Sequence, residues 1–382
     1  MSPLNLLTQS HGASTVDTVS GLDGADDGLG RDASLLVHSS MLLEPGATMS
    51  TRAKEGLVPR DVPGDQTSTL KLLSVGRTPG VRGTDPWADA GRKVLRFHLA
   101  RMVARVPGVL AGQDPEEVHA MRVAARRMRA AWRVFGDGFE RGATRQYRND
   151  LHVIGGRLGA VRDLDVLLAI LTTGVDGRSG RGRAGVAPLV GAWSAERDAR
   201  RAELVAVLTS EAFREFVDEY VELVTTERAS RQLSPTARAL VRTRIASSAW
   251  GAYEAVWAFE RVVGDADLAT LHQLRIAAKW LRYTLEFVRE LLEPEATCLI
   301  RPVVALQDHL GAQHDLHVAA TLGREFAAAS PALARHELRS IENFIDTMDA
   351  GVVRFGSSFG RTWRSVVDPA YRRRLGRGLA RL

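Results

Sequence analysis

"VHAMRVAARRMRAAWRVF", residues 118–135, has the pattern of an amphipathic helix that carries five arginines and one histidine. His119, Arg122, Arg126, Arg129 and Arg133 follow one another at steps of 3, 4, 3 and 4, so they form one stripe along the helix. A second, apolar stripe is turned away from the first and is expected to be the packing face. It consists of Met121, Ala124, Ala125, Met128, Trp132 and Phe135.

Two interpretations of the basic stripe are open at this point, a solvated helix face and an anion-binding site. An exposed helix usually mixes signs, because like charges one turn apart repel and opposite charges attract. The stretch from His119 to Arg133 contains no acidic residue. This absence favours a site that binds anions.

The same pattern returns later in the chain, which makes a chance arrangement less plausible. "HAMRVAARRMR" starts at His119 and "HQLRIAAKWLR" starts at His272, an offset of 153. A second motif pair, "LGAVRDLDVLLA" from Leu158 and "LGAQHDLHVAAT" from Leu310, is offset by 152. Each copy spans about four helices, so the sequence predicts two four-helix bundles related by a pseudo-twofold axis.

The chain divides into an irregular first part and a helical remainder. Residues 1–85 are rich in Gly, Ser, Thr, Asp and Pro and are expected to be flexible or irregular. They carry 7 Lys/Arg and 10 Asp/Glu, whereas residues 86–382 carry 44 and 35, a net charge of +9. Helical periodicity without a competing strand pattern predicts an all-α domain over 86–368, with the first repeat at about 86–210, the second at about 236–350 and a basic tail at 369–382.

Helices are expected over the following segments, in which apolar residues recur at helical spacing. They are 86–106, 115–136, 139–171, 185–208, 236–264, 268–292, 296–328 and 331–349, with further short helices at 211–226 and after Gly351.

Composition restricts the setting in which the chain works. Cys298 is the only cysteine, so no disulfide can form within the chain, which fits a reducing compartment. No segment has the length and apolar purity of a membrane span, and the N-terminus does not resemble a signal peptide. The chain is therefore expected to be cytoplasmic and to have no membrane partner.

The basic stripe suits a long polyanion better than a single phosphate. Successive helical turns place a cation about every 5 Å along the axis. A linear chain of phosphates can lie along such a row and accept a charge-assisted hydrogen bond from each turn. Binding of this kind releases counterions, so its affinity is expected to fall steeply with salt.

These residues resemble a CHAD domain, the conserved-histidine α-helical domain. The resemblance covers about residues 86–368 and rests on "DPEEVHAMRVAARRMRAAWRVF", "LGAVRDLDVLL", "LHQLRIAAKWLRYTLEF" and "LQDHLGAQHDLHVA" in this order. It implies two pseudo-twofold-related bundles that bind inorganic polyphosphate in a basic groove, association with polyphosphate granules and no catalytic activity. We expect neither a cofactor nor a metal.

The resemblance also implies the ligands of polyphosphate, carried over motif by motif. Arg92, Lys93 and Arg96 precede the first motif and are weaker candidates. Arg127 is also weaker, because its counterpart in the second copy is Trp280. The candidates are His119, Arg122, Arg126, Arg127, Arg129, His272, Arg275, Lys279, Arg282, Arg92, Lys93 and Arg96.

Asp163 and Asp315 hold equivalent positions in the second motif pair. We expect each carboxylate to orient arginines of the neighbouring stripe. An alternative is a metal-dependent phosphohydrolase that uses the His/Asp cluster at 308–317, although further metal ligands are not identifiable. Another alternative is a nucleic-acid-binding protein, which is disfavoured because the stripe lacks interleaved aromatic residues.

The histidine at the head of each stripe predicts a pH-dependent affinity. Neighbouring arginines favour the neutral imidazole, whereas bound phosphate favours the imidazolium. Polyphosphate affinity is therefore expected to rise as the pH falls from about 8 to 6.

Overall fold

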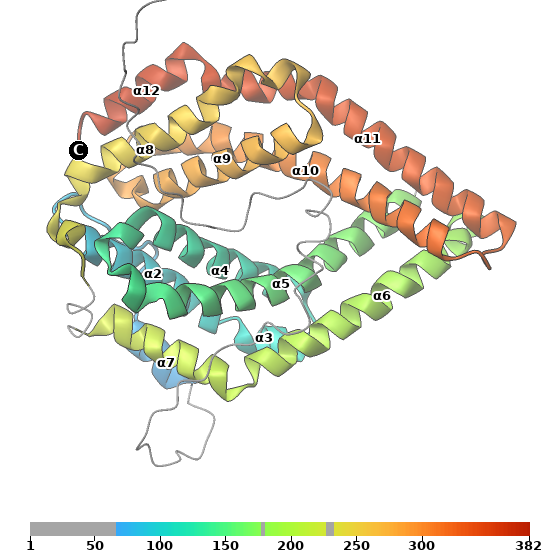
Figure 1. Cartoon of the computed structure of the whole chain (residues 1–382), viewed down its shortest axis with the longest axis horizontal. Coiled ribbons are helices and arrows are strands. Elements are labelled where there is room, and N and C mark those ends of the chain that lie inside the picture. The colour runs from blue at the N-terminus through green and yellow to red at the C-terminus, as the bar shows by residue number, and fades with distance from the viewer. Residues whose placement is uncertain (1–65, 177–179, 227–232) are drawn as a thin grey trace, which may run out of the picture.

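The computed structural model describes residues 66–176, 180–226 and 233–382 (Figure 1). Its described residues form helices and contain no β-strand, only two isolated bridges that pair Pro86 with Leu240 and Phe139 with Leu233. The all-α prediction is thus confirmed, while the pseudo-twofold axis stays a prediction. Residues 1–65 of the segment that was expected to be flexible or irregular lie outside the described residues.

Seven α-helices make up the described part of the first half of the chain. They are α1 (Gln66–Leu73), α2 (Trp87–Val103), α3 (Val106–Ala111), α4 (Pro115–Phe135), α5 (Arg141–Asp176), α6 (Gly180–Leu208) and α7 (Glu211–Thr225).

Five α-helices follow in the second half, with short 3-10 turns between elements. The helices are α8 (Val241–Trp257), α9 (Leu268–Phe287), α10 (Ala296–Ala329), α11 (Arg335–Val367) and α12 (Pro369–Leu379). The 3-10 turns are η1 (Gly136–Gly138), η3 (Pro235–Arg238), η4 (Ala258–Arg261), η5 (Val263–Asp265) and η6 (Arg289–Leu292).

The structure differs from the expected boundaries at three places. Helix α1 lies within the segment 1–85, and its Leu73 is fully buried, so the ordered part begins before Asp85. Helix α11 runs without interruption past Gly351, because Phe359, Trp363 and Val366 continue its buried face. The basic tail forms helix α12, which buries Tyr371 and Leu375 despite its arginines.

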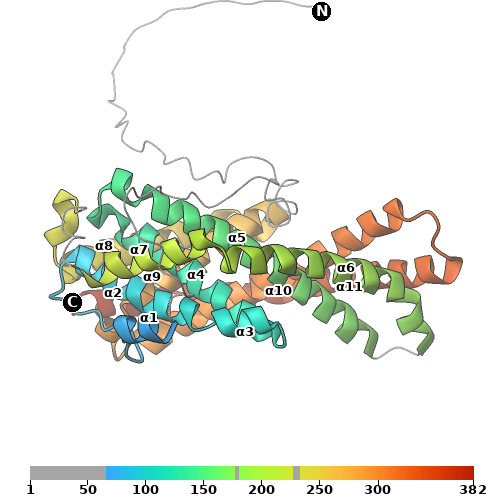
Figure 2. The same cartoon turned by 90° about the horizontal axis from the view of Figure 1, so that it is seen from below.

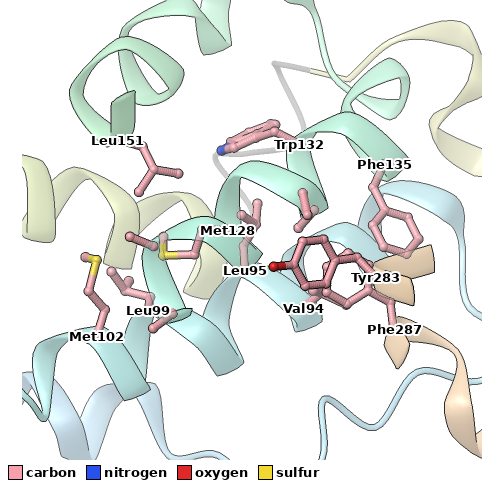
Figure 3. Close-up of a cluster of buried hydrophobic side chains, with 14 of the residues drawn as sticks. Val94, Leu95, Leu99, Met102, Met128, Trp132, Phe135, Leu151, Tyr283 and Phe287 are labelled. Carbon is pink, nitrogen blue, oxygen red and sulfur yellow. The ribbon is translucent and has the colours of Figure 1, made fainter. Parts of the chain in front are cut away.

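One hydrophobic core joins the two halves of the chain. It takes buried side chains from α2, α4, α5 and α7 and from α8, α9, α10 and α12. In Figure 3, Leu95 and Leu99 of α2 and Met128 and Trp132 of α4 lie together, with Phe287 of α9 close by. The face of α4 that enters this core is the apolar stripe, which leaves the basic stripe outside the core.

A second, smaller core lies at the far end of the molecule. It brings together Leu167 of α5, Trp193 of α6, Ala319 of α10 and Phe344 of α11 with neighbouring apolar residues. The Trp193 and Phe344 rings meet edge to face with centroids 6.2 Å apart. Figures 1 and 2 show α6 and α11 extending from the main body and meeting at the end away from the C-terminus. The two halves therefore pack against each other at two places.

Candidate anion-binding site

The helices that carry the two basic stripes begin with the same local structure. Asp114 caps α4 by accepting a hydrogen bond from the Glu116 N–H at 2.9 Å, and Asp267 caps α9 by accepting one from the Thr270 N–H at 2.7 Å. His119 and His272 each follow their cap by five residues. An aspartate side chain at the N-cap satisfies a backbone N–H that has no partner within the helix. The caps thus start both stripes in the same helical register.

The predicted packing faces are buried. On α4 all six predicted apolar residues are buried, and on α9 Leu274, Ala278, Leu281 and Leu285 are buried in the same way. The α4 stripe (His119, Arg122, Arg126 and Arg129) and the α9 stripe (His272, Arg275, Lys279 and Arg282) consequently lie on the sides of their helices that face away from the core.

The two stripes converge on each other. Arg133 of α4 and Lys279 of α9 both lie over the ring of Trp280, with the guanidinium carbon 4.6 Å and Nζ 5.0 Å from its centroid. Burial together with Arg275 and the α4 guanidinium groups of Arg126, Arg129 and Arg122 lowers the pKa of Lys279 to about 7. Like charges this close favour the neutral amine over the ammonium ion. The site is therefore strongly electropositive before any anion binds.

Helices α5 and α10 place one carboxylate against each stripe. Arg122 forms an ion pair with Asp163, with Nη2 and Oδ1 3.1 Å apart. Asp315 interacts with Arg275, but burial, the larger effect, raises the pKa of Asp315 and lowers that of Arg275. The carboxylates predicted from the second motif thus lie beside the arginines of the first motif in both halves.

The two stripe histidines occupy environments that keep the imidazole neutral. Burial, then the charge of Arg162, lowers the pKa of His119, with Glu116 opposing the shift. Burial, followed by Arg275 and Lys279, lowers the pKa of His272 to about 4. The Nδ1 atoms of both histidines are buried and have no hydrogen-bond partner among the described residues.

A small pocket of about 30 Å³ adjoins His272, between α9 and α10. Arg275, Gln313, His314 and His317 line it together with three leucines. The rings of His272 and His314 have centroids 5.6 Å apart, and burial, Arg275 and His272 lower the pKa of His314 to about 3. His314 was not among the predicted ligands, although the 152-residue offset aligns it with Arg162, which flanks His119.

Helix α5 presents bare backbone beside the α4 stripe. A Cβ atom on Gly159 would lie 3.6 Å from Arg122 Nε, and one on Gly155 would lie 3.9 Å from Arg129 Cδ. Larger side chains at these two glycines would crowd the space next to the guanidinium groups. The glycines therefore leave room beside the cations.

Two of the predicted ligands, Arg127 and Arg282, instead form an ion-pair network with a carboxylate of the protein. Glu286 accepts from Arg127 Nη2 at 2.9 Å and from Arg282 Nε at 2.8 Å, while Arg282 Nη1 donates to Gln307 Oε1 at 3.1 Å. Arg127 and Arg282 are thus already partnered. The network links α4, α9 and α10 at the end of the stripes.

The structure does not bring Arg92, Lys93 and Arg96 of α2 to the stripes. Arg92 pairs with Asp89 on its own helix, and Lys93 Nζ lies 2.7 Å from Asp85 Oδ2. Arg96 donates from Nε to the Leu73 carbonyl at 2.6 Å, which satisfies the last turn of α1. The partner of Arg96 was missed because Leu73 belongs to the segment 1–85 that was expected to be irregular.

The described residues contain no group of three or more His, Cys, Asp or Glu side chains that could hold a metal ion. Asp165 forms an ion pair with Arg197, with Oδ1 and Nε 2.9 Å apart. His309 forms a hydrogen bond with the Phe355 carbonyl oxygen at 2.8 Å, and its ring contacts the Phe355 ring. His309 thus contacts α11, whereas His314 and Asp315 lie beside α9. None of the helices in the described ranges is long and apolar enough to cross a membrane.

Comparison with known proteins identifies related chains. The family model described as "CHAD domain" matches residues 93–324. A crystal structure of the CHAD domain from the plant Ricinus communis aligns with a TM-score of 0.62 and 23% identity, covering 76% of this chain and 97% of that one. PptA from Streptomyces chartreusis aligns with a TM-score of 0.59 and 18% identity, covering 73% of this chain and 100% of that one. No curated protein matches the chain.

Proposed function

The chain belongs to the CHAD domain family, and from this premise we propose that its converging stripes bind inorganic polyphosphate without catalysing a reaction on it. Association with polyphosphate granules in the cytoplasm is part of the same proposal. The observation that carries it is the approach of Arg122, Arg126 and Arg129 on α4 to Lys279 on α9.

An anion bound among these clustered cations stabilises them. Holding several cations together in partly desolvated surroundings costs free energy, which the lowered pKa of Lys279 reflects. A bound polyanion offsets this cost, because each phosphate accepts charge-assisted hydrogen bonds from the guanidinium groups. Asp163 pairs with Arg122, and the charge of Asp315 lies close to Arg275, so the two carboxylates neutralise only part of the charge of the cluster.

The repeating geometry favours a linear anion. Each stripe presents one base per helical turn, about 5 Å apart, so phosphates along a chain meet successive bases. The two facing stripes can contact such a chain from both sides. A single orthophosphate would engage only one turn of each helix.

The sharpest test removes stripe bases that have no carboxylate partner among the described residues. Arg126 and Lys279 fulfil this condition, whereas Arg122, Arg127 and Arg282 form ion pairs with acids and Arg275 lies within the field of Asp315. We expect Arg126→Ala with Lys279→Ala to weaken polyphosphate binding by roughly a hundredfold, since each lost contact to a charged group is worth about 1.5 kcal/mol or more. The measurement is a titration with polyphosphate of defined length at several salt concentrations.

A matched control removes the same charge elsewhere. Arg339 and Arg354 are exposed on α11, so their double alanine variant is expected to bind polyphosphate like the unaltered chain. The slope of log affinity against log salt should fall by roughly 1 to 2 in the stripe variant only. Equal losses in both variants, or unchanged binding in the stripe variant, would place the site elsewhere.

Competition distinguishes the proposed ligand from nucleic acid. At a fixed salt concentration, polyphosphate is expected to displace duplex DNA at equal phosphate concentration. Tighter binding of DNA would instead support the nucleic-acid alternative. Release of orthophosphate on addition of Mg²⁺ or Mn²⁺ would contradict a purely binding role.

A further inference from the structure

The 51 Lys and Arg side chains of the protein include only four lysines, Lys54, Lys71, Lys93 and Lys279. Lys279 stands at the position where the first repeat has Arg126. Lysine and arginine are not equivalent at such a position, because only lysine readily loses its proton and becomes a nucleophile. A chain that uses arginine almost throughout thus has one lysine among the bases of its candidate site.

The surroundings of Lys279 differ from those of the other described lysines. Its Nζ lies 5.0 Å from the Trp280 ring centroid and has no carboxylate partner in the described ranges. Lys93 is held by Asp85, and Lys71 is exposed on α1. Burial and four neighbouring guanidinium groups lower the pKa of Lys279 to about 7, so about half of its amine is neutral near pH 7.

Lys279 therefore combines two properties within one site, a neutral amine and a set of phosphate-binding groups around it. A lysine desolvated beside other cations is an activated nucleophile. Guanidinium groups bind a phosphoryl group through paired hydrogen bonds. The ligand chemistry that engages both is an acyl phosphate, which carries an electrophilic carbonyl carbon bonded through oxygen to a phosphate.

We propose that Lys279 is a modification site that accepts the acyl group of acyl phosphates docked on the guanidinium groups of Arg122, Arg126 and Arg275, and that this acylation weakens polyphosphate binding. The proposal rests on the anion-binding site of the proposed function. It adds a covalent control of that site.

The step balances without a further reactant. The neutral Nζ attacks the carbonyl carbon, a C–N bond forms, and the bond between that carbon and the phosphate oxygen breaks. The phosphate leaves with the electron pair of the broken bond and takes up the proton released from nitrogen, which gives hydrogen phosphate and an amide. No group is oxidised or reduced.

The product has lost the property that binding requires. An acylated lysine is uncharged at every pH, so it cannot become an ammonium ion when polyphosphate arrives. It also adds bulk between the two stripes, beside Trp280. Polyphosphate affinity is expected to fall roughly tenfold, the value of one charged contact.

The experiment treats the full chain with acetyl phosphate at pH 7 and follows each lysine by peptide mass spectrometry. Lys279 is expected to be acetylated at least roughly tenfold faster than Lys71 and Lys93, because only about one in 2,500 amines is neutral at pH 7 for an ordinary lysine pKa. Excess polyphosphate should protect Lys279 and leave the rates at Lys71 and Lys93 unchanged. Acetylation of all lysines at similar rates would overturn the proposal.

Two controls separate docking from simple reactivity and modification from binding. N-hydroxysuccinimide acetate, which has no phosphate, should show a smaller preference for Lys279 than acetyl phosphate does, and an equal preference would refute phosphate docking. Lys279→Arg removes the nucleophile, so acetyl phosphate should leave the polyphosphate affinity of this variant unchanged. The same treatment should lower the affinity of the unaltered chain about tenfold. A similar loss of affinity in Lys279→Arg would show that another lysine is responsible.

The outcomes also distinguish this inference from the proposed function. Failure of the untreated chain to bind polyphosphate would refute the proposed function, even where Lys279 is acetylated quickly. Intact polyphosphate binding with slow acetylation of Lys279 would refute the modification alone.

Discussion

At the scale of single residues, the protonation of Lys279 rather than of the histidines is expected to set the pH response. The pKa of His272 is lowered to about 4, below the pH range of 6 to 8 over which the histidines were expected to titrate. Lys279 has a pKa of about 7 and faces Arg275 on its own helix and Arg122, Arg126 and Arg129 on α4. We therefore still expect polyphosphate affinity to rise as the pH falls from 8 to 6, but we assign this rise to Lys279 instead of the histidines.

The sign follows from linkage between proton and ligand binding. Bound phosphate raises the pKa of Lys279 above its value in the free protein. Polyphosphate affinity is therefore highest below pH 7, and it declines as the pH rises from about 7 toward the pKa of Lys279 in the bound state. We predict a decline of up to about tenfold per pH unit between pH 7 and 9, measured by titration at fixed salt. Lys279→Arg should remove this decline, and an equal decline in that variant would contradict the assignment.

Residues of the same type on one helix differ in role because their partners differ. Arg126 and Arg127 are adjacent in sequence, and each has a buried Nε without a hydrogen-bond partner in the described part of the chain, but Arg127 also pairs with Glu286 whereas Arg126 receives no acid from the described residues. A buried donor without a partner costs free energy, and a bound anion can supply the missing acceptor. This contrast makes Arg126 the better candidate ligand.

At the scale of elements, Glu286 connects the two stripe helices. It is the common acceptor for Arg127 of α4 and Arg282 of α9, and its side chain is 19% exposed. We predict that Glu286→Gln lowers the free energy of unfolding by about 1 to 3 kcal/mol, because two partly buried guanidinium groups lose their counter-charge. Urea unfolding provides the measurement.

The exposed pair of Arg214 and Glu211 on α7 provides the matched control for this prediction. Their side chains are 45% and 62% exposed and lie 2.8 Å apart within one helix. Glu211→Gln should change the free energy of unfolding by less than about 0.5 kcal/mol, since exposed ion pairs are screened by water. Similar losses for the two variants would show that Glu286 does not link the helices energetically.

At the scale of the whole molecule, the second core holds the far ends of the two halves together. Trp193 of α6 is 7% exposed and packs on Phe344 of α11. Trp193→Ala is expected to lower the free energy of local unfolding around the second core by about 3 to 5 kcal/mol, because the lost apolar volume leaves a cavity. Hydrogen exchange should then accelerate in α6 and the first half of α11, while α2 and α4 keep their protection.

Trp257→Ala is the control for the second core, because Trp257 is 44% exposed at the end of α8. It should leave the exchange of α6 and α11 unchanged. An equal loss of protection in α2 and α4 after Trp193→Ala would mean that the two cores unfold as one cooperative unit.

The sequence by itself determined the helices and the direction of their faces. Helical periodicity and capping depend on residues within a few positions, so the register of α4 and α9 and the equivalence of His119 with His272 could be predicted from spacing. The helices α1 and α12 were missed, since their burial depends on contacts with distant segments and their short, polar sequences carry weak periodicity.

Only the tertiary structure decided which bases remain available to a ligand. Packing of α9 against α4 brings Arg127 to Glu286, and packing of α1 against α2 gives Arg96 its carbonyl partners, whereas Arg126 and Lys279 receive no acid from the described residues. Charge pairing and desolvation depend on distances between residues far apart in sequence, which local patterns do not contain. The same distances brought five cations of two helices together and gave Lys279 its lowered pKa.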